Sequence, residues 1–441
     1  MKKKILNVIA AAFTAAARRI NQHVTDSGIA VLDRTTPMAL PGATPMREAG
    51  AERIAAVVVG GADNGGGLGL VRSLGGARVP VVAVDRNAMA PALHSRFARH
   101  VVMPELSGPS FVEGLLRLGS TPVLFLTTDE AVLTVSEHRA ALETCYRIRL
   151  PSHDSLVALS RKSAFHELAE RNGFAVPRSI YLRAMSDVAS LVRLRFPLVI
   201  KPSVKTAHYL ARQFERCYRV ASIAEAQAVC RDVLPVLPDL VAQEWIEGPD
   251  TALYFCLQYR GAGGAIASFT GRKLSIWPPD VGTTASCIAA PEAHGELQRL
   301  TDAFFAAVVF TGMGGMEYKR DARSGEFFMI EPTVGRVDWQ EEVATLNGVN
   351  IPLAAYLHET GSDARCVTVA MPPTIWRDTA RHWKSSNQRS ADEKARAYDA
   401  YWRLDDPLPA LVHGFSLGTR VLRRGLRHVE PRLSGKALEK A

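Results

Sequence analysis

Residues 316–332, MEYKRDARSGEFFMIEP, consist of two short apolar runs on either side of a polar segment. The pattern predicts strands over 315–319 and 326–331, joined by a turn at 321–325. Hairpin pairing would bring Glu317 near Glu331, although an unpaired carboxylate in an apolar run is costly. Two adjacent carboxylates need a cation between them, and oxygen ligands suit Mg²⁺ that is bound together with phosphates. Two separate salt bridges explain this pair of glutamates equally well.

Two other predicted strands end in polar residues. The apolar run 197–200 ends at Lys201, directly before Pro202, where a charge is desolvated unless it meets an anion. A solvated lysine at the end of a strand is the alternative interpretation. The stretch Gln243-Glu244-Trp245-Ile246 ends another strand, and its backbone and apolar side chains suit an adenine ring. Core packing alone also explains Trp245 and Ile246.

The first half of the chain alternates strands and helices. Residues 54–59, 79–85 and 123–126 are apolar runs of the kind found in buried parallel strands. Alternation of such strands with helices predicts an open α/β sheet over residues 53–150.

A glycine-rich segment, residues 60–67, follows the first of these strands. It lacks the GxGxxG spacing, so we interpret it as a tight turn between strand and helix rather than a dinucleotide site. Further along, apolar residues at helical spacing predict a helix from Asp154 to Asn172.

The net charge of +9 is concentrated at the two ends of the 441-residue chain. Residues 1–52 carry +3 and residues 410–441 carry +5, so the remainder is almost neutral and does not resemble a nucleic-acid-binding surface. The apolar run 5–17 is too short to span a bilayer. A basic amphipathic helix over 417–440 could contact anionic lipid or dock on the protein.

Composition and cysteine spacing exclude several classes of protein. With 47% apolar and 22% charged residues, the chain is neither largely disordered nor collagen-like. Its six cysteines are scattered and have no zinc-ligand spacing, which favours reduced thiols and a cytoplasmic location, with peripheral contact at the inner face of the membrane as a variant.

The order of motifs from about Val57 to Tyr356 resembles the ATP-grasp superfamily, especially its carboxylate–amine ligases of the D-aspartate ligase and carbamoyl-phosphate-synthase-like type. No single motif is specific, but their collinear order over some 300 residues is. The motifs are LGLVRSL (68–74), TTDE (127–130), RKS (161–163), FPLVIKP (196–202), QEWIEG (243–248), FTGRK (269–273), MEYKRD (316–321) and MIEP (329–332).

The resemblance implies a nucleotide site. Lys162 and Lys201 match two lysines that contact ATP phosphates in the family. Gln243, Glu244 and Ile246 match the strand whose backbone holds adenine. The family's cofactors, ATP and Mg²⁺ (for which Mn²⁺ can substitute), are therefore expected.

The resemblance also implies ribose and metal ligands. Asp250 matches the acidic residue that binds the ribose hydroxyls, and Glu317 and Glu331 match the metal-binding carboxylates. Where the family's metal strand commonly reads Glu-x-Asn-x-Arg, this chain has Thr333 in place of the amide, a weaker ligand.

Catalytic cations are implied at three positions. Arg272 and Lys273 lie where the family often places a cation near the transferred phosphate or the substrate. Arg336 corresponds to the arginine of the metal strand but is displaced by one position. Family members activate a carboxylate as an acylphosphate, from which an amine or another nucleophile displaces phosphate.

Together these observations predict a mixed α/β (α+β) protein with an ATP-grasp fold. An N-terminal open parallel α/β domain would precede two α+β lobes that clamp ATP, followed by a helical C-terminal tail. The predicted segments are a basic and apolar helix with linker (1–52), the α/β domain (53–150), the small lobe with its linking helix (151–240), the catalytic lobe (241–360) and a helical extension with a basic tail (361–441).

The predicted function is ligation of a small carboxylate to an amine, with release of ADP and phosphate. The expected partners are these small-molecule substrates and no nucleic acid, with homo-oligomerisation and weak membrane-surface contact left open. The alternative is a nucleotide-binding or regulatory module on the same fold that has lost turnover. Substrate determinants are expected at 277–280, 282–284 and 337–340.

Overall fold

The computed structural model describes residues 54–61, 65–203, 209, 212, 214–215, 217–280, 282–364, 369, 371–385 and 395–418. The chain divides into two units, residues 1–50 and 51–441, and everything below concerns the second. The predicted N-terminal helix and linker (1–52) and residues 419–441 of the basic tail lie outside the described residues.

The predicted open α/β sheet is present as a four-stranded parallel sheet of order β3-β2-β1-β4. Its strands are β1 (Ala56–Val59), β2 (Val81–Asp85), β3 (Ala98–Val102) and β4 (Val123–Leu126), with helices α2 (Gly66–Gly76), α3 (Gly108–Leu118) and α4 (Asp129–Glu137) between and after them. All four residues of β1 are buried, as expected for an apolar strand covered on both faces.

The described parts of the glycine-rich segment after β1, residues 60–61 and 65–67, lie close together where the strand gives way to α2, as the predicted tight turn requires. Gly60 and Gly61 have φ angles of +85° and +94°, which side chains rarely tolerate. A Cβ atom on Gly67, in the first turn of α2, would lie 2.3 Å from the Gly60 carbonyl oxygen. Glycine is therefore required on both sides of this close approach.

The single helix predicted from Asp154 to Asn172 is wrong in one respect. The structure has two helices, α6 (His153–Ser160) and α7 (Lys162–Arg171), separated by Arg161. Arg161 has extended backbone angles (φ −95°, ψ 119°), which no α-helix accommodates. The break makes Lys162 the first residue of α7.

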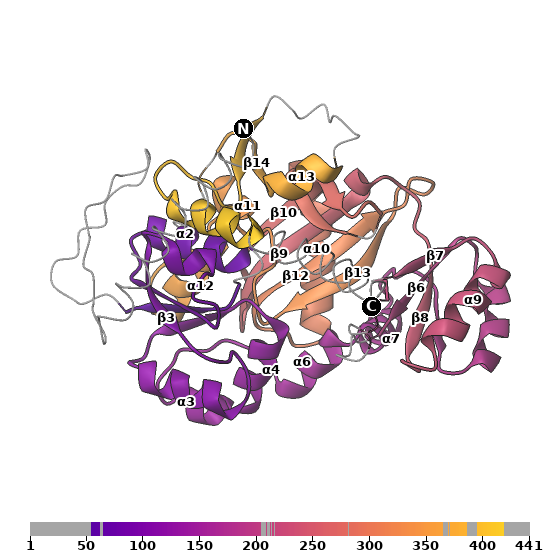
Figure 1. Ribbon diagram of the computed structural model, residues 1–441, viewed down its shortest axis with the longest axis horizontal. Coiled ribbons are helices and arrows are strands. Elements are labelled where there is room, and N and C mark those ends of the chain that lie inside the picture. The colour runs from indigo at the N-terminus through magenta and orange to yellow at the C-terminus, as the bar shows by residue number, and fades with distance from the viewer. Residues whose placement is uncertain are drawn as a thin grey trace, which may run out of the picture. The chain divides into compact units, whose positions relative to one another are not determined.

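A four-stranded antiparallel sheet of order β5-β8-β6-β7 follows in the chain. It contains β5 (Ser179–Leu182), β6 (Leu198–Pro202), β7 (Tyr218–Val220) and β8 (Leu240–Glu244), and is accompanied by α9 (Ile223–Val233) and the 3₁₀ helix η2 (Met185–Arg193) (Figure 1). Leu198 and Ile200 of β6 are completely buried against Ala226 and Cys230 of α9. This packing leaves Lys201 at the polar end of an otherwise apolar strand.

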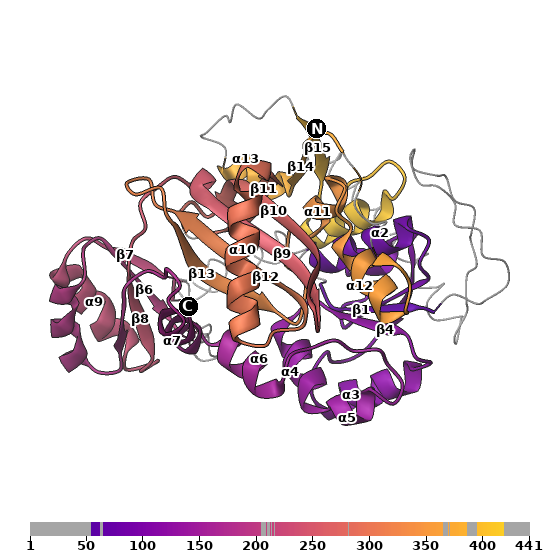
Figure 2. The same ribbon diagram turned by 180° about the vertical axis from the view of Figure 1, so that it is seen from behind.

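The largest sheet has seven strands in the order β13-β12-β9-β10-β11-β14-β15. Its strands are β9 (Leu253–Gly261), β10 (Gly264–Trp277), β11 (Thr283–Ala289), β12 (Gly312–Arg320), β13 (Phe327–Val334), β14 (Thr374–Arg377) and β15 (Arg396–Asp399). Helix α10 (Pro291–Ala307) runs across one face (Figure 2). Leu297, Phe304 and Phe305 of α10 share a core with Tyr254 and Tyr318 of the sheet, and this contact covers that face.

The C-terminal segment differs from the purely helical extension that we predicted. Helices α11 (Glu342–Leu346) and α12 (Ile351–Glu359) precede this segment, which spans 361–441. Besides α13 (Thr379–Ser385) and a helix over 408–418, it contributes strands β14 and β15. Strand β14 pairs with β11 through Trp376 and Cys287, and both residues are buried. The mixed charges of this segment did not indicate a strand. Residues 374–377 form one because they pair with the edge of β11.

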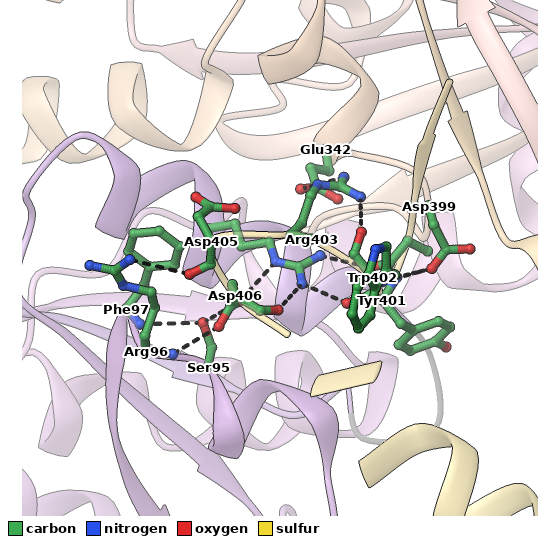
Figure 3. A network of polar contacts seen from close by, with 12 residues as sticks. Ser95, Arg96, Phe97, Glu342, Asp399, Tyr401, Trp402, Arg403, Asp405 and Asp406 are labelled. Atoms are coloured by element: carbon green, nitrogen blue, oxygen red, sulfur yellow. Dashed lines mark hydrogen bonds and ion pairs between the residues drawn. The ribbon is translucent and has the colours of Figure 1, made fainter. Parts of the chain in front are cut away.

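A buried polar network fastens the end of this segment to the parallel-sheet domain (Figure 3). Arg72 of α2 donates hydrogen bonds to Asp406 and to the carbonyl oxygens of Ala400 and Tyr401. Asp406 also accepts hydrogen bonds from the Ser95 hydroxyl and the Arg96 amide.

Within the described residues, no helix is both long enough and apolar enough to cross a membrane.

Candidate functional site

The two glutamates singled out from the sequence are direct partners across the β12–β13 pair. Glu317 lies opposite Glu331, and Thr333, two residues further along β13, lies opposite Gly315. Hairpin pairing therefore brings the two carboxylates together as predicted. Glu317 alternates with Met316 and Tyr318, which pack toward α10, so its side chain lies on the other face of the sheet.

Each of these carboxylates is paired with a lysine from another element. The Lys273 ammonium of β10 lies 2.5 Å from a Glu317 oxygen, and Lys162 at the start of α7 lies 2.5 Å from Glu331. The Lys273 side chain is only 5% exposed. Burial alone would lower its pKa, but the Glu317 carboxylate outweighs burial and holds the pKa of Lys273 above its ordinary value.

Lys201 adds a third ammonium group beside this pair of bridges. Desolvation, and then the nearby charge of Lys162, lower the pKa of Lys201 to about 8, although Glu331 and Glu317 oppose this. Lys162, Lys201 and Lys273 therefore face Glu317 and Glu331, and three cations against two carboxylates leave an excess of positive charge. We call these five residues the lysine–glutamate cluster.

The side chain of Gln243 on β8 is held by a histidine of α7 and a serine of β5. Its amide nitrogen lies 2.6 Å from Nε2 of His166 on α7 and donates to the Ser179 hydroxyl at 3.1 Å. Burial, and then the charges of Lys201 and Lys162, lower the pKa of His166 to about 3, so this imidazole is neutral. Gln243 and His166 thus fix the position of α7, and with it Lys162.

The side chain of Glu244 is also committed to other residues. It accepts a hydrogen bond from the Arg195 amide at 3.0 Å and forms ion pairs with Arg178 at 3.4 Å and Arg195 at 3.6 Å. The amides of Glu244 and Trp245 donate to the carbonyl oxygens of Arg178 and Pro197. Within the described chain the Ile246 amide makes no hydrogen bond, so it is the donor of this segment that a ligand could use.

Asp250 begins the 3₁₀ helix η3 (Asp250–Ala252), directly after the 243–248 segment. Burial raises its pKa, and the neighbouring Asp280 adds to the effect, while Lys319 and Lys273 oppose it. Asp250 therefore lies within electrostatic reach of the lysine–glutamate cluster.

Arg336 connects the end of β13 to the parallel-sheet domain. Its guanidinium forms an ion pair with Asp129, the first residue of α4, which follows the carboxyl end of β4. Burial would lower the pKa of Arg336, but the Asp129 carboxylate, helped by Asp338 and Glu331, outweighs burial and raises this pKa above its ordinary value. Two residues on, Asp338 contributes to the raised pKa of Lys273, so the loop after β13 lies within electrostatic reach of the cluster.

Arg272 is the one candidate that the structure separates from the others. It lies opposite Tyr254, whose side chain belongs to the core beneath α10, and its guanidinium is 3.9 Å from Glu292 of that helix. Neighbouring residues of a strand point to opposite faces, so Arg272 and Lys273 cannot both reach the cluster. The expectation that both cations serve one site needs this correction.

Three residues of the site were not among those assigned from the sequence. Asp129 follows the carboxyl end of a parallel strand, where ligands commonly bind. His166 lies four residues after Lys162, on the same face of a helix. Lys319 lies two residues after Glu317, on the same face of a strand. In each case the signal was simple periodicity or position.

The donor set suits a metal ion that is shared with phosphates. In the described part of the chain, no group of three or more His, Cys, Asp or Glu residues could hold a metal ion unaided. Glu317, Glu331 and the neutral Thr333 oxygen would supply at most part of a coordination shell. Mg²⁺ characteristically takes one or two carboxylates and completes its shell with phosphate oxygens and water.

Comparison with known proteins identifies the fold. No family model matches the chain, and no curated protein matches it in sequence. Among solved structures, N5-carboxyaminoimidazole synthetase from Staphylococcus aureus is similar, with a TM-score of 0.58 and 11% identity over 74% of this chain and 82% of that one.

Two further enzymes show the same likeness. The biotin carboxylase domain of Hydrogenobacter thermophilus 2-oxoglutarate carboxylase, in complex with MgADP, ADP and bicarbonate, has a TM-score of 0.55 and 14% identity, covering 74% of each chain. N5-carboxyaminoimidazole synthase from Aspergillus clavatus, in complex with ADP and 5-aminoimidazole ribonucleotide, has a TM-score of 0.55 and 15% identity, over 73% of this chain and 81% of that one. At such identities it is the architecture that is shared, and the chain has the ATP-grasp fold that the order of its motifs predicted.

Proposed function

We propose that this protein is an ATP- and Mg²⁺-dependent ligase that joins a small carboxylic acid to an amine or another nucleophile. The observation that carries the proposal is the lysine–glutamate cluster, which brings together residues from four strands and one helix. Phosphoryl transfer depends mainly on positioning and charge neutralisation, so it requires cations and a metal rather than a nucleophilic side chain. The neighbours' complexes with ADP and MgADP support the same ligands here.

In this proposal the cluster binds the triphosphate. Lys162 and Lys201 would contact phosphate oxygens, and Lys273 would act at the transferred phosphoryl group. Glu317 and Glu331, with Thr333, would hold Mg²⁺ (or Mn²⁺) together with the nucleotide. Bound there, the ion would supply charge neutralisation at the phosphates.

The nucleoside would lie between β8 and β12. The Ile246 amide would donate to the adenine edge, and Asp250 would accept hydrogen bonds from the ribose hydroxyls. The buried side chains of Gln243 and Glu244 would not touch the nucleotide. Their role would be to hold the 243–246 segment in place through His166 and Arg195.

The carboxylate and the nucleophile would bind near Arg336 and the loop that follows it. In the reaction, the acid takes the terminal phosphoryl group of ATP to form an acylphosphate and ADP, and the amine then displaces phosphate. Two of the predicted substrate segments meet at this loop, because the Trp339 indole donates to the Thr284 carbonyl oxygen at 3.1 Å. The Arg381 guanidinium lies 4.3 Å from the centre of the Trp339 ring.

A second candidate is a nucleotide-binding module without turnover. It is favoured by Thr333, a neutral and weaker ligand, and by the commitment of Arg336 to Asp129. Both candidates predict ATP binding, so the release of phosphate distinguishes them.

The decisive experiment is an ATP-hydrolysis screen of the full chain over libraries of carboxylates and amines with Mg²⁺, in which products are identified by mass. We expect Glu331→Gln to abolish turnover while weakening nucleotide binding much less. Glu326→Gln is the matched control, because Glu326 is exposed in the same hairpin. Failure to release ADP and phosphate with any substrate pair would refute the ligase, and an active Glu331→Gln enzyme would remove this residue from the metal site.

Membrane contact and self-association remain separate proposals. The basic residues of 419–441 would supply the membrane contact, by attraction to anionic headgroups. Sedimentation with anionic liposomes should fall when the chain ends at Gly418, and equal sedimentation of both forms would refute the contact.

Analytical ultracentrifugation of the full chain tests self-association, and a monomer at all concentrations would refute it.

A further inference from the structure

Lys319 is a buried cation that the roles assigned above do not use. It lies on β12 two residues after Glu317 and is 7% exposed. Because side chains alternate along a strand, it shares the face of Glu317. Two residues of a strand span roughly 7 Å, so Lys319 lies about that distance from the proposed metal ligand.

The contacts of Lys319 do not satisfy its ammonium group. Its nitrogen lies 4.5 Å from the centre of the Trp245 ring, and the Arg219 guanidinium lies 4.6 Å from the centre of the same ring. In the part of the chain that the structure describes, the Lys319 side chain makes no hydrogen bond and no ion pair. The Lys319 nitrogen is not one of the fully buried polar atoms without a partner, so its three donors remain open to a ligand.

The surroundings of Lys319 are those of a hydroxyl-binding position. Lys319 lies opposite Leu253 of β9, and Leu253 directly follows η3, the short helix that Asp250 begins. A cation and a carboxylate thus lie close together beside the aromatic ring of the segment proposed to hold the base.

We propose that Lys319 is a specificity-determining residue that donates hydrogen bonds to the ribose hydroxyls of the bound nucleotide. A hydroxyl both donates and accepts, so Asp250 and Lys319 together satisfy both of its capacities. The contact of the ammonium group with the Trp245 ring places it beside the segment proposed to hold the nucleoside. This inference rests on the proposed function, because it requires that a nucleotide binds between β8 and β12.

The test compares three probes, namely MgATP, Mg-2′,3′-dideoxyATP and magnesium tripolyphosphate, by isothermal titration calorimetry on the full chain. Lys319→Met removes the charge but keeps the length and the packing. We expect it to weaken MgATP binding roughly tenfold or more, as for a lost charge-assisted hydrogen bond. Binding of dideoxyATP and tripolyphosphate should change less than about twofold, and Lys319→Arg should restore part of the ATP affinity.

The melting temperature of Lys319→Met separates ligand binding from a purely structural role, because loss of a structural contact would lower it. Replacing a buried, unpaired cation by an apolar side chain should leave the melting temperature equal or higher. Lys384→Met, at an exposed position of α13, is the control for loss of one positive charge.

Three outcomes would overturn the inference. They are unchanged ATP affinity in Lys319→Met, an equal loss for ATP and tripolyphosphate (a phosphate contact instead), and a lowered melting temperature with equal loss for all probes. If the wild-type chain binds none of the probes, the proposed function itself fails.

Discussion

Replacing Asp406 by alanine removes the centre of the network that holds the C-terminal segment to the parallel-sheet domain. Asp406 is 1% exposed and lies 3.0 Å from the Arg72 guanidinium, whose side chain is 6% exposed. Asp406 also accepts hydrogen bonds from the Ser95 hydroxyl at 2.8 Å and the Arg96 amide at 2.9 Å. The substitution therefore removes all three of these side-chain contacts at once.

The expected cost follows from what remains after the substitution. Arg72 keeps its hydrogen bonds to the carbonyl oxygens of Ala400 and Tyr401, at 2.9 and 2.7 Å, but its charge is left buried without a counter-ion. Breaking a buried pair in this way typically costs about 3–5 kcal/mol in the free energy of unfolding. Unfolding in urea, followed by circular dichroism, measures this free energy.

Two further variants separate the lost ion pair from other effects. Asp405→Ala is the matched control, because Asp405 is exposed and its side chain has no role in the network; it should change stability by less than about 0.5 kcal/mol. The double variant Arg72→Met, Asp406→Leu should be more stable than Asp406→Ala alone, since it leaves no unpaired charge. An Asp406→Ala protein within about 1 kcal/mol of wild type would refute the reasoning.

Three further predictions concern the site, a buried acid and the glycine turn. Because the pKa of Lys201 is about 8, the affinity for MgATP should fall between pH 7 and pH 9 as this ammonium group loses its proton. Calorimetry of Lys201→Arg should show a shallower fall, and equal slopes for the two proteins would contradict the assignment. Burial raises the pKa of Glu341 to about 8 from an ordinary value of 4.5, and neither of its carboxylate oxygens has a hydrogen-bond partner in the described chain. The folded state therefore holds a proton that the unfolded state releases, so the free energy of unfolding should decline from about pH 4.5 to about pH 8, by up to ~1.4 kcal/mol per pH unit. Urea unfolding at pH 5 and pH 8 measures this decline, which Glu341→Gln should remove. A variant with the wild-type slope would contradict this. Gly67→Ala should lower the melting temperature, at a cost of about 1–3 kcal/mol, because the new methyl group would lie 2.3 Å from the Gly60 oxygen. Gly76→Ala is the control and should be tolerated, because a Cβ atom there meets nothing within 4 Å. Equal melting temperatures for the two variants would refute the close approach.

The local sequence determined the strands and their pairing near the site. Apolar runs that end in a charged residue placed Lys201 at the end of β6, and a five-residue polar segment between two apolar runs made Glu317 and Glu331 cross-strand partners. Strand alternation and hairpin geometry depend on neighbours in the chain, so such features can be read from the chain alone.

Which residues share the site was decided by tertiary structure. Lys162 and Glu331 are 169 positions apart, and Arg336 and Asp129 are 207 apart, so no local pattern could pair them. The same is true of β14, which is a strand because the edge of β11 is available to it.

Arg272 and Lys273 mark the boundary between the two kinds of information. The sequence placed both in one motif, FTGRK (269–273), and assigned both to the site. In the structure both lie on β10, where alternation points them to opposite faces. Only the packing of α10 on one face showed that Arg272 is the residue turned away, and that Lys273 meets Glu317. Sequence determines the two faces of a strand, but which face becomes the site depends on what covers the other, and that is a property of the whole fold.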